Sequence, residues 1–165
     1  MDDCAECGFT YALDEAEEAG PRIASGVESL ADLVAGLGDD AARRRNDGAW
    51  SPLEYGCHVR DVLLVQRERA LLALRETAPG VAPMGRDERA EHDGYADQDP
   101  IDVAAQLLQA RTMLANVLAR LEPADWERTL IYNYPTVAER SLRGLAIHTL
   151  HEVTHHLLDG RRQLD

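Results

Sequence analysis

Two histidines stand four residues apart near the end of the chain, in His151-Glu152-Val153-Thr154-His155. Residues at this spacing project from one face of a helix, one turn apart, so both imidazoles can reach a single metal ion. The string also matches the His-Glu-x-x-His signature of zinc proteases, in which the glutamate is the general base. The chemistry that it predicts therefore depends on the third ligand.

In zinc proteases of this kind the third ligand lies downstream of the motif. After His155 the chain offers His156, Asp159 and Asp165 as candidates. The first points about 100° away from its neighbour around the helix, and the second lies one further turn along. A zinc hydrolase with Glu152 as its base is therefore the least favoured function. The better third ligand lies upstream, at His58.

Apolar residues at spacings of three and four predict helices over residues 12–37, 52–76, 100–122 and 141–160. Gly38 ends the first, and Ser51-Pro52-Leu53-Glu54 starts the second with a capping box and a proline at the first helical position. Gly160 fits the position after the last helix. These signals predict one all-α domain over residues 1–165, a four-helix bundle, with residues 1–10 as an appendage.

The segments between these helices carry little periodicity. Residues 79–99 are rich in proline, glycine and charge, which predicts a long surface connection. Residues 129–136 have weak strand or loop character. On the last helix one stripe is expected to face the core, and it places His151 and His155 inward and Glu152 off the ligand face. The stripe is Ile147, Leu150, His151, Thr154, His155 and Leu158.

Composition excludes several classes of function. Thirty acidic residues against seventeen basic ones give a net charge of −13, so phosphate backbones and anionic lipids would repel the chain. We therefore expect neither nucleic acid nor membrane as a partner, and a small molecule instead. With no apolar run of membrane length and no secretory signal pattern, the expected location is the cytoplasm.

The segment Trp50-Ser51-Pro52-Leu53-Glu54, followed by His58 and paired with the histidines of the last helix, resembles the DinB-like superfamily of four-helix metalloproteins. The resemblance implies a three-histidine divalent metal site made by His58, His151 and His155, with positions open to water or substrate. It ranks zinc first, with nickel or iron as alternatives. The superfamily includes mycothiol-dependent maleylpyruvate isomerase and S-transferases that use bacillithiol or mycothiol.

The resemblance thus implies a metal-dependent thiol S-transferase or isomerase with a low-molecular-weight thiol as cosubstrate, because a metal-bound thiol is deprotonated at neutral pH. The alternative is a non-catalytic protein whose metal anchors a ligand. Three further residues are candidates for the surroundings of the site. Glu54 either orients His58 or only caps its helix, Asp61 either supports the site or pairs with an arginine, and His148 either lines the pocket or packs elsewhere. We expect His156 to pack at the helix exit or to face a neighbouring helix, ahead of a contact with the pocket, and His92 to lie on the surface.

Cys4 and Cys7 form a Cys-x-x-Cys pair at the start of the chain. Three cysteines, an odd number, favour reduced thiols over a disulfide framework. The pair fits a second metal site, completed by histidine or carboxylate ligands that a second subunit of a homodimer could also supply, or a reactive redox tail. Cys57, beside His58, is expected to be a small core residue.

Overall fold

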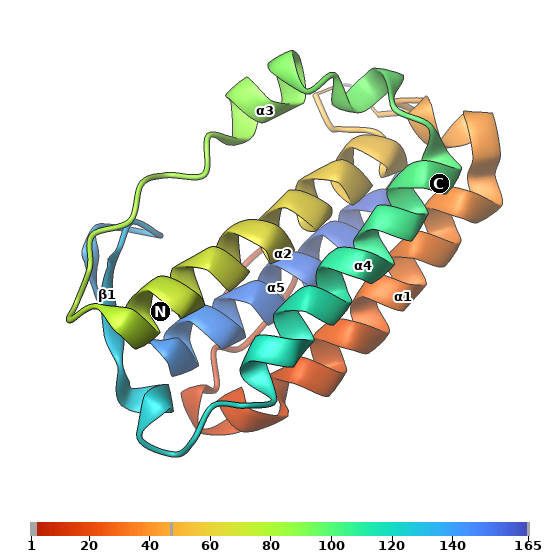
Figure 1. The fold of residues 1–165 in the computed structure, drawn as a ribbon. Coiled ribbons are helices and arrows are strands. Elements are labelled where there is room, and N and C mark those ends of the chain that lie inside the picture. Colours follow the sequence, from red (N-terminus) through yellow and green to blue (C-terminus); the bar gives the residue numbers. More distant parts are fainter. Residues whose placement is uncertain (1–2, 47, 165) are drawn as a thin grey trace.

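The computed structural model describes residues 3–46 and 48–164, and it contains the expected all-α four-helix bundle (Figure 1). The long helices are α1 (Ala19–Leu37), α2 (Pro52–Arg75), α4 (Pro100–Leu118) and α5 (Leu142–Arg162). Helices α1 and α2 each pack against both α4 and α5, so consecutive helices α1 and α2 occupy opposite corners of the bundle. Residues 1–2 of the predicted appendage, and Asp165, lie outside the described residues.

The helices begin where the capping signals predict. Ser51 accepts a hydrogen bond from the Glu54 N–H, and the Glu54 carboxylate accepts one from the Ser51 N–H, which completes the capping box. Asp99 caps α4 by accepting from two backbone N–H groups, and Ser141 caps α5. Gly38 ends α1 with φ of 53°, a conformation that favours glycine.

Three helix ends differ from the prediction. Residues Leu13–Glu18 form a 3₁₀ turn before α1, and α4 stops at Leu118. Helix α5 continues past Gly160, which was expected to follow its end. A Cβ atom at Gly160 would lie 3.3 Å from Leu33 Cδ2, so this glycine serves the close packing of α5 against α1.

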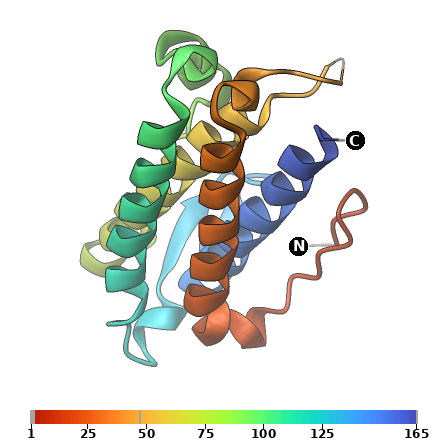
Figure 2. The same cartoon turned by 90° about the vertical axis from the view of Figure 1, so that its right-hand side faces the viewer.

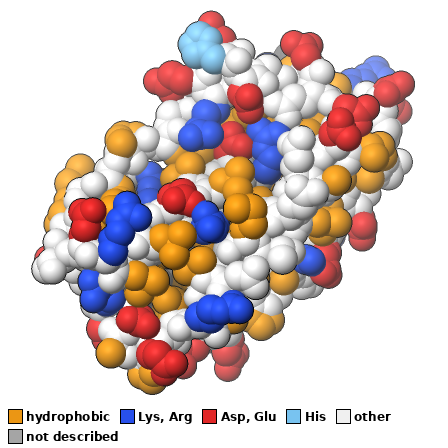
Figure 3. Space-filling model, viewed as in Figure 1, with side chains coloured by type: hydrophobic (Ala, Val, Ile, Leu, Met, Phe, Trp, Pro, Cys, Tyr) orange, Lys and Arg blue, Asp and Glu red, His pale blue; other side chains and the backbone are white. Residues whose placement is uncertain are grey.

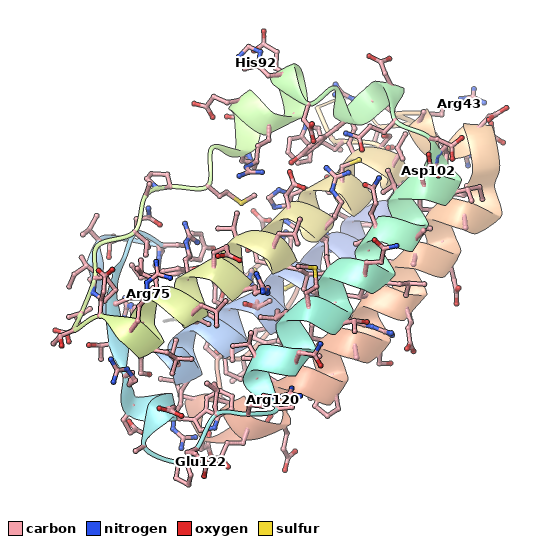
Figure 4. The ribbon with its side chains drawn as sticks, viewed as in Figure 1. Arg43, Arg75, His92, Asp102, Arg120 and Glu122 are labelled. Carbon is pink, nitrogen blue, oxygen red and sulfur yellow. The ribbon has the colours of Figure 1, made fainter. Side chains whose placement is uncertain are left out.

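The long connection before α4 is more ordered than expected. It contains the short helix α3 (Arg86–His92) and a 3₁₀ turn at Tyr95–Asp97. Tyr95 is fully buried and its hydroxyl donates to Asp61 Oδ2 at 2.7 Å, which fastens the connection to α2. Sequence periodicity misses such an anchor because it is one residue long. Figure 4 shows His92 on the outer side of α3, pointing away from the bundle as expected.

The segment with weak strand character forms a small hairpin. Strand β1 (Thr129–Tyr132) pairs antiparallel with β2 (Ala138–Ser141), with Thr129 opposite Ser141 and Tyr132 opposite Ala138. The hairpin leads directly into α5. Two further 3₁₀ turns, Gly38–Ala42 and Asp125–Glu127, complete the connections.

The segment that precedes α1 extends beside α5 (Figure 2). Arg162, near the end of α5, donates to the backbone oxygen of Glu6 at 3.0 Å, and Phe9 and Tyr11 pack against the core. Within the described part of the chain, the helices fall short of what crossing a membrane requires.

Helix α1 approaches α5 closely at Gly26, where an added Cβ would lie 2.6 Å from Val153 Cγ1. We expect Gly26→Ala to lower the free energy of unfolding by about 1–3 kcal/mol, because the added methyl overpacks this contact. The matched control is Gly36→Ala in the same helix, where a Cβ meets no atom within 4 Å. It should raise stability by up to about 1 kcal/mol through helix propensity. Urea unfolding measures both, and equal effects would contradict the close approach.

Candidate metal centre

Glu152 lies among four histidine side chains. Its Oε2 is 3.4 Å from His58 Nε2 and 3.5 Å from His156 Nε2. Its Oε1 is 3.2 Å from His148 Nε2 and 3.6 Å from His151 Nδ1. Helix α2 supplies His58, and α5 supplies the other three together with the carboxylate. One buried anion is therefore shared by imidazoles from two helices.

This arrangement sets the charge of the groups. Burial would raise the pKa of Glu152, but the close imidazoles around its carboxylate, His148 first, hold that pKa well below its ordinary value. Burial lowers the pKa of His58, so this imidazole is neutral at pH 7, as a metal ligand must be. Burial also lowers the pKa of His156. The carboxylates of Asp159 and Glu152 outweigh this effect and raise the pKa of His156 to about 9.

Four clusters of potential ligands have all their donor atoms within 4.8 Å of one another among the described residues. The first joins α2 to α5, and the second joins the N-terminal segment to α5. The third and fourth clusters lie along α5, and each combines two residues of the first two clusters with one further residue. In this order the clusters are His58 with Glu152 and His156; Cys4 and Cys7 with His151 and His155; His148 with His151 and Glu152; and His155 with His156 and Asp159.

The structure divides the predicted ligand set. His58 shares no cluster with His151 or His155, and its partners are instead Glu152 and His156. The expectation that Glu152 points off the ligand face is therefore wrong. His156 faces the neighbouring helix α2, which is the second of the two placements expected for it. Thr154, expected to face the core, is exposed. Ile147, Leu150 and His151 of the predicted stripe are buried, and the stripe fails at Thr154.

Several imidazole nitrogens support a metal at these positions. His58 Nδ1, His148 Nε2 and both ring nitrogens of His151 are buried, with no hydrogen-bond partner in the described structure. Buried polar atoms without partners are costly unless something else binds them. Two imidazoles and one carboxylate form a donor set of catalytic zinc sites, which leave one position open. The residues of the first cluster thus fit a divalent metal.

The first cluster lies on the wall of a cavity of about 630 Å³. Val62 and Val65 of α2 supply apolar surface, and Arg69 and Arg86 supply positive charge. Figure 3 shows arginines and apolar side chains mixed on the face seen in Figure 1. The remaining walls come from the hairpin, the connection before α3 and the N-terminal segment, with Tyr132, Asn133, Tyr134, Pro83, Met84, Gly85, Cys4, Ala5 and Glu6.

The comparisons with known proteins agree with this fold. The family model of the DinB superfamily matches residues 25–159, most of the chain. The chain belongs to the DinB superfamily. Among solved structures it is similar to YfiT from Bacillus subtilis, described as a probable metal-dependent hydrolase with an unusual four-helix bundle topology. The two share 19% identity at a TM-score of 0.77, covering 92% of this chain and 88% of YfiT. No curated protein matches the chain.

A hydrogen-bond chain behind the cavity of this DinB-superfamily bundle positions His148. Gln66 donates to the Tyr132 hydroxyl at 2.7 Å, and that hydroxyl lies 2.7 Å from His148 Nδ1. Since the hydroxyl accepts from Gln66, its own proton goes to Nδ1, and Nε2–H then faces Glu152. Arg69 donates to Gln66 Oε1 at 3.2 Å. Sequence reasoning missed Gln66 and Arg69, although two polar residues on the inner side of α2 are an unusual feature.

The other two candidates for the surroundings of the site have separate roles. Asp61 accepts hydrogen bonds from Arg60, Arg89 and Tyr95, which is the arginine-pairing alternative. Glu54 caps α2 and pairs with Arg44. Neither belongs to a ligand cluster. Cys57 is fully buried, as expected for a small core residue.

Glu54 yields a pH-dependent prediction. Burial would raise the pKa of this carboxyl, but Arg44 and Ser51 outweigh it and lower the pKa below 4.5. The ionised carboxylate thus stabilises the fold above pH 4.5, and this contribution is lost as the pH falls through the lowered pKa. We expect Glu54→Gln to cost about 1–3 kcal/mol of unfolding free energy at neutral pH, and less in acid.

Urea unfolding of wild type and Glu54→Gln across this pH range measures the difference. Glu68→Gln, at an exposed position of the same helix, is the matched control and should change little. Metal affinity should stay unchanged in Glu54→Gln. Loss of metal from this variant would instead place Glu54 among the residues that orient His58.

Proposed function

We propose that the protein is a metal-dependent enzyme in which His58, Glu152 and His156 hold a divalent metal, zinc first, that activates a low-molecular-weight thiol. One observation carries the proposal. Three ligand atoms from α2 and α5 lie within 4.8 Å of one another on the wall of a cavity large enough for a small molecule. Three protein ligands with an open position are typical of catalytic rather than structural zinc sites.

A divalent metal bound here lowers the pKa of a thiol or water molecule placed in its open position. The side chains of the chain hold the site in place for this chemistry. Asp159 Oδ2 lies 3.2 Å from His156 Nδ1, so that His156 Nε2 is directed toward Glu152. A carboxylate behind a ligating histidine fixes the orientation and tautomer of the ring.

The thiol reading rests on the superfamily and on the charge of the cavity. The sequence motifs resemble those of a superfamily that includes mycothiol- and bacillithiol-dependent enzymes. Arg86 lies on the cavity wall with its guanidinium 5.5 Å from the centre of the Trp50 ring, which holds a positive charge at the wall. Such a charge suits the carboxylates of bacillithiol or glutathione.

Hydrolysis is the second candidate, because the description of YfiT names a metal-dependent hydrolase and water can occupy the same open position. In that case Glu152 is a metal ligand, so its oxygens are not free to act as the general base. The two reactions need the same three ligands and differ in the nucleophile. A substrate screen therefore separates the two reactions. Metal binding without turnover of thiol-dependent or hydrolytic substrates would favour the ligand-binding alternative.

We expect His58→Gln, Glu152→Gln and His156→Gln each to remove one equivalent of metal and lower thiol-dependent turnover by more than about 100-fold, since even changes behind the ligands cost 10–100-fold. Elemental analysis after dialysis gives the metal content. Transfer from mycothiol, bacillithiol or glutathione to electrophilic acceptors gives the activity. His92→Gln, an exposed histidine on α3, is the matched control and should retain both.

Full metal content in His58→Gln would contradict the proposed ligand set. Turnover of esters or amides without any thiol would replace the thiol reaction by hydrolysis. Metal binding with no turnover of either substrate class would contradict the enzyme proposal and favour the binding role.

A further inference from the structure

The N-terminal Cys-x-x-Cys pair is held in a closed turn. The Cys4 N–H donates to Phe9 O at 2.9 Å, and the Gly8 N–H donates to Cys4 O at 2.8 Å. Gly8 has φ of +72°, which lets the chain reverse immediately after Cys7. This turn brings the two thiols of Cys4 and Cys7 to one side of the segment.

The segment that carries these thiols runs beside α5 (Figure 2). Cys4 Sγ is 3.7 Å from His155 Nδ1, and the donor atoms of Cys4, Cys7, His151 and His155 all lie within 4.8 Å of one another. Arg162 binds the backbone oxygen of Glu6, between the two cysteines, at 3.0 Å. The segment is therefore placed against the helix by its thiols and by the backbone between them.

His151 provides an independent indication of a ligand. The residue is only 4% exposed, and neither ring nitrogen has a hydrogen-bond partner in the described structure. Phe9 and Tyr11 of the same segment pack on its ring, with centroid distances of 5.3 Å and 5.2 Å. Apolar packing of this kind excludes water, so the ring nitrogens need another partner.

We infer that Cys4, Cys7, His151 and His155 form a second metal site, of the closed four-coordinate type that takes zinc. Two thiolates and two imidazoles are a complete tetrahedral donor set, and sulfur ligands select zinc over harder cations such as magnesium. Each cysteine loses its thiol proton to solvent on binding the metal. This site uses none of the ligands assigned to the catalytic metal, so it does not depend on the proposed function.

His155 has the supporting contacts that such a site requires. Its Nε2 lies 3.2 Å from Asp159 Oδ2 and 3.5 Å from Glu6 Oε2, while its Nδ1 faces Cys4. Ligating histidines usually donate the other ring N–H to a carboxylate, which directs the free nitrogen to the metal. Asp159 therefore serves both sites, through His155 in one and His156 in the other.

The second site determines one wall of the cavity. Cys4, Ala5 and Glu6 line the same cavity as His58 and Glu152. A metal that ties the N-terminal segment to α5 thus keeps this wall in place next to the catalytic cluster. The site is structural in its chemistry, and its effect on the neighbouring site is to shape the space for substrate.

The test compares full-length variants purified under reducing conditions with zinc alone as the probe. We expect two equivalents of zinc in wild type, one in the double variant Cys4→Ala/Cys7→Ala, and one in His58→Gln. X-ray absorption should show sulfur at about 2.3 Å in wild type and His58→Gln and none in the double cysteine variant. Cys57→Ala, which removes the buried third cysteine, is the matched control and should retain two equivalents.

A second measurement is the protection of the two thiols by zinc. In wild type, zinc should protect Cys4 and Cys7 from alkylation by iodoacetamide, and a chelator should restore their reaction. His155→Gln should abolish the protection, and circular dichroism before and after substitution establishes that the helices remain folded.

The possible outcomes separate the two metal proposals. One equivalent of zinc without sulfur ligands overturns the second site and leaves the proposed function intact. One equivalent with two sulfur ligands supports the second site and contradicts the catalytic cluster. Unchanged metal content in the double cysteine variant, or cysteines that zinc does not protect, overturns the inference.

Discussion

The burial of one carboxylate among four imidazoles is the interaction on which the rest of the site depends. An ionised glutamate inside a bundle is costly unless charged or hydrogen-bonding partners compensate it. Glu152 finds these partners on α2 and α5 at once, and this requires the two helices to pack along their length. The same contacts that make the carboxylate tolerable place it with His58 and His156, where a divalent metal would take over the role of the imidazole protons.

The elements outside the four helices enclose this charge cluster. The hairpin contributes Tyr132, whose hydroxyl sets the tautomer of His148, and the buried pair Gln66 and Arg69 supports that tyrosine from α2. On the other side, the N-terminal segment brings two thiols against His151 and His155. Helix α5 therefore carries two adjacent sets of candidate ligands, and their division follows from which face of the helix meets which neighbour.

Much of the fold follows from local signals. The capping box at Ser51 and Glu54, the proline at the start of α4 and the glycine after α1 each place a helix end through short-range hydrogen bonding or backbone geometry. The sequence analysis missed Tyr95 and misassigned Gly160 because their roles depend on contacts with residues distant in sequence. The buried Tyr95 fastens the connection before α4, and Gly160 permits α5 to pack closely against α1. Neither role has a local sequence signature.

The sequence by itself determined that the protein is a four-helix bundle, and it identified candidate ligands on α5, at His58 of α2 and in the N-terminal Cys-x-x-Cys pair. Only the tertiary structure decided which ligands meet. Helix α5 is buried on nearly every side over its first half, so its apolar residues define no single stripe that would identify its neighbours. Packing against α2 brings Glu152 and His156 to His58, while the N-terminal segment brings the two cysteines to His151 and His155.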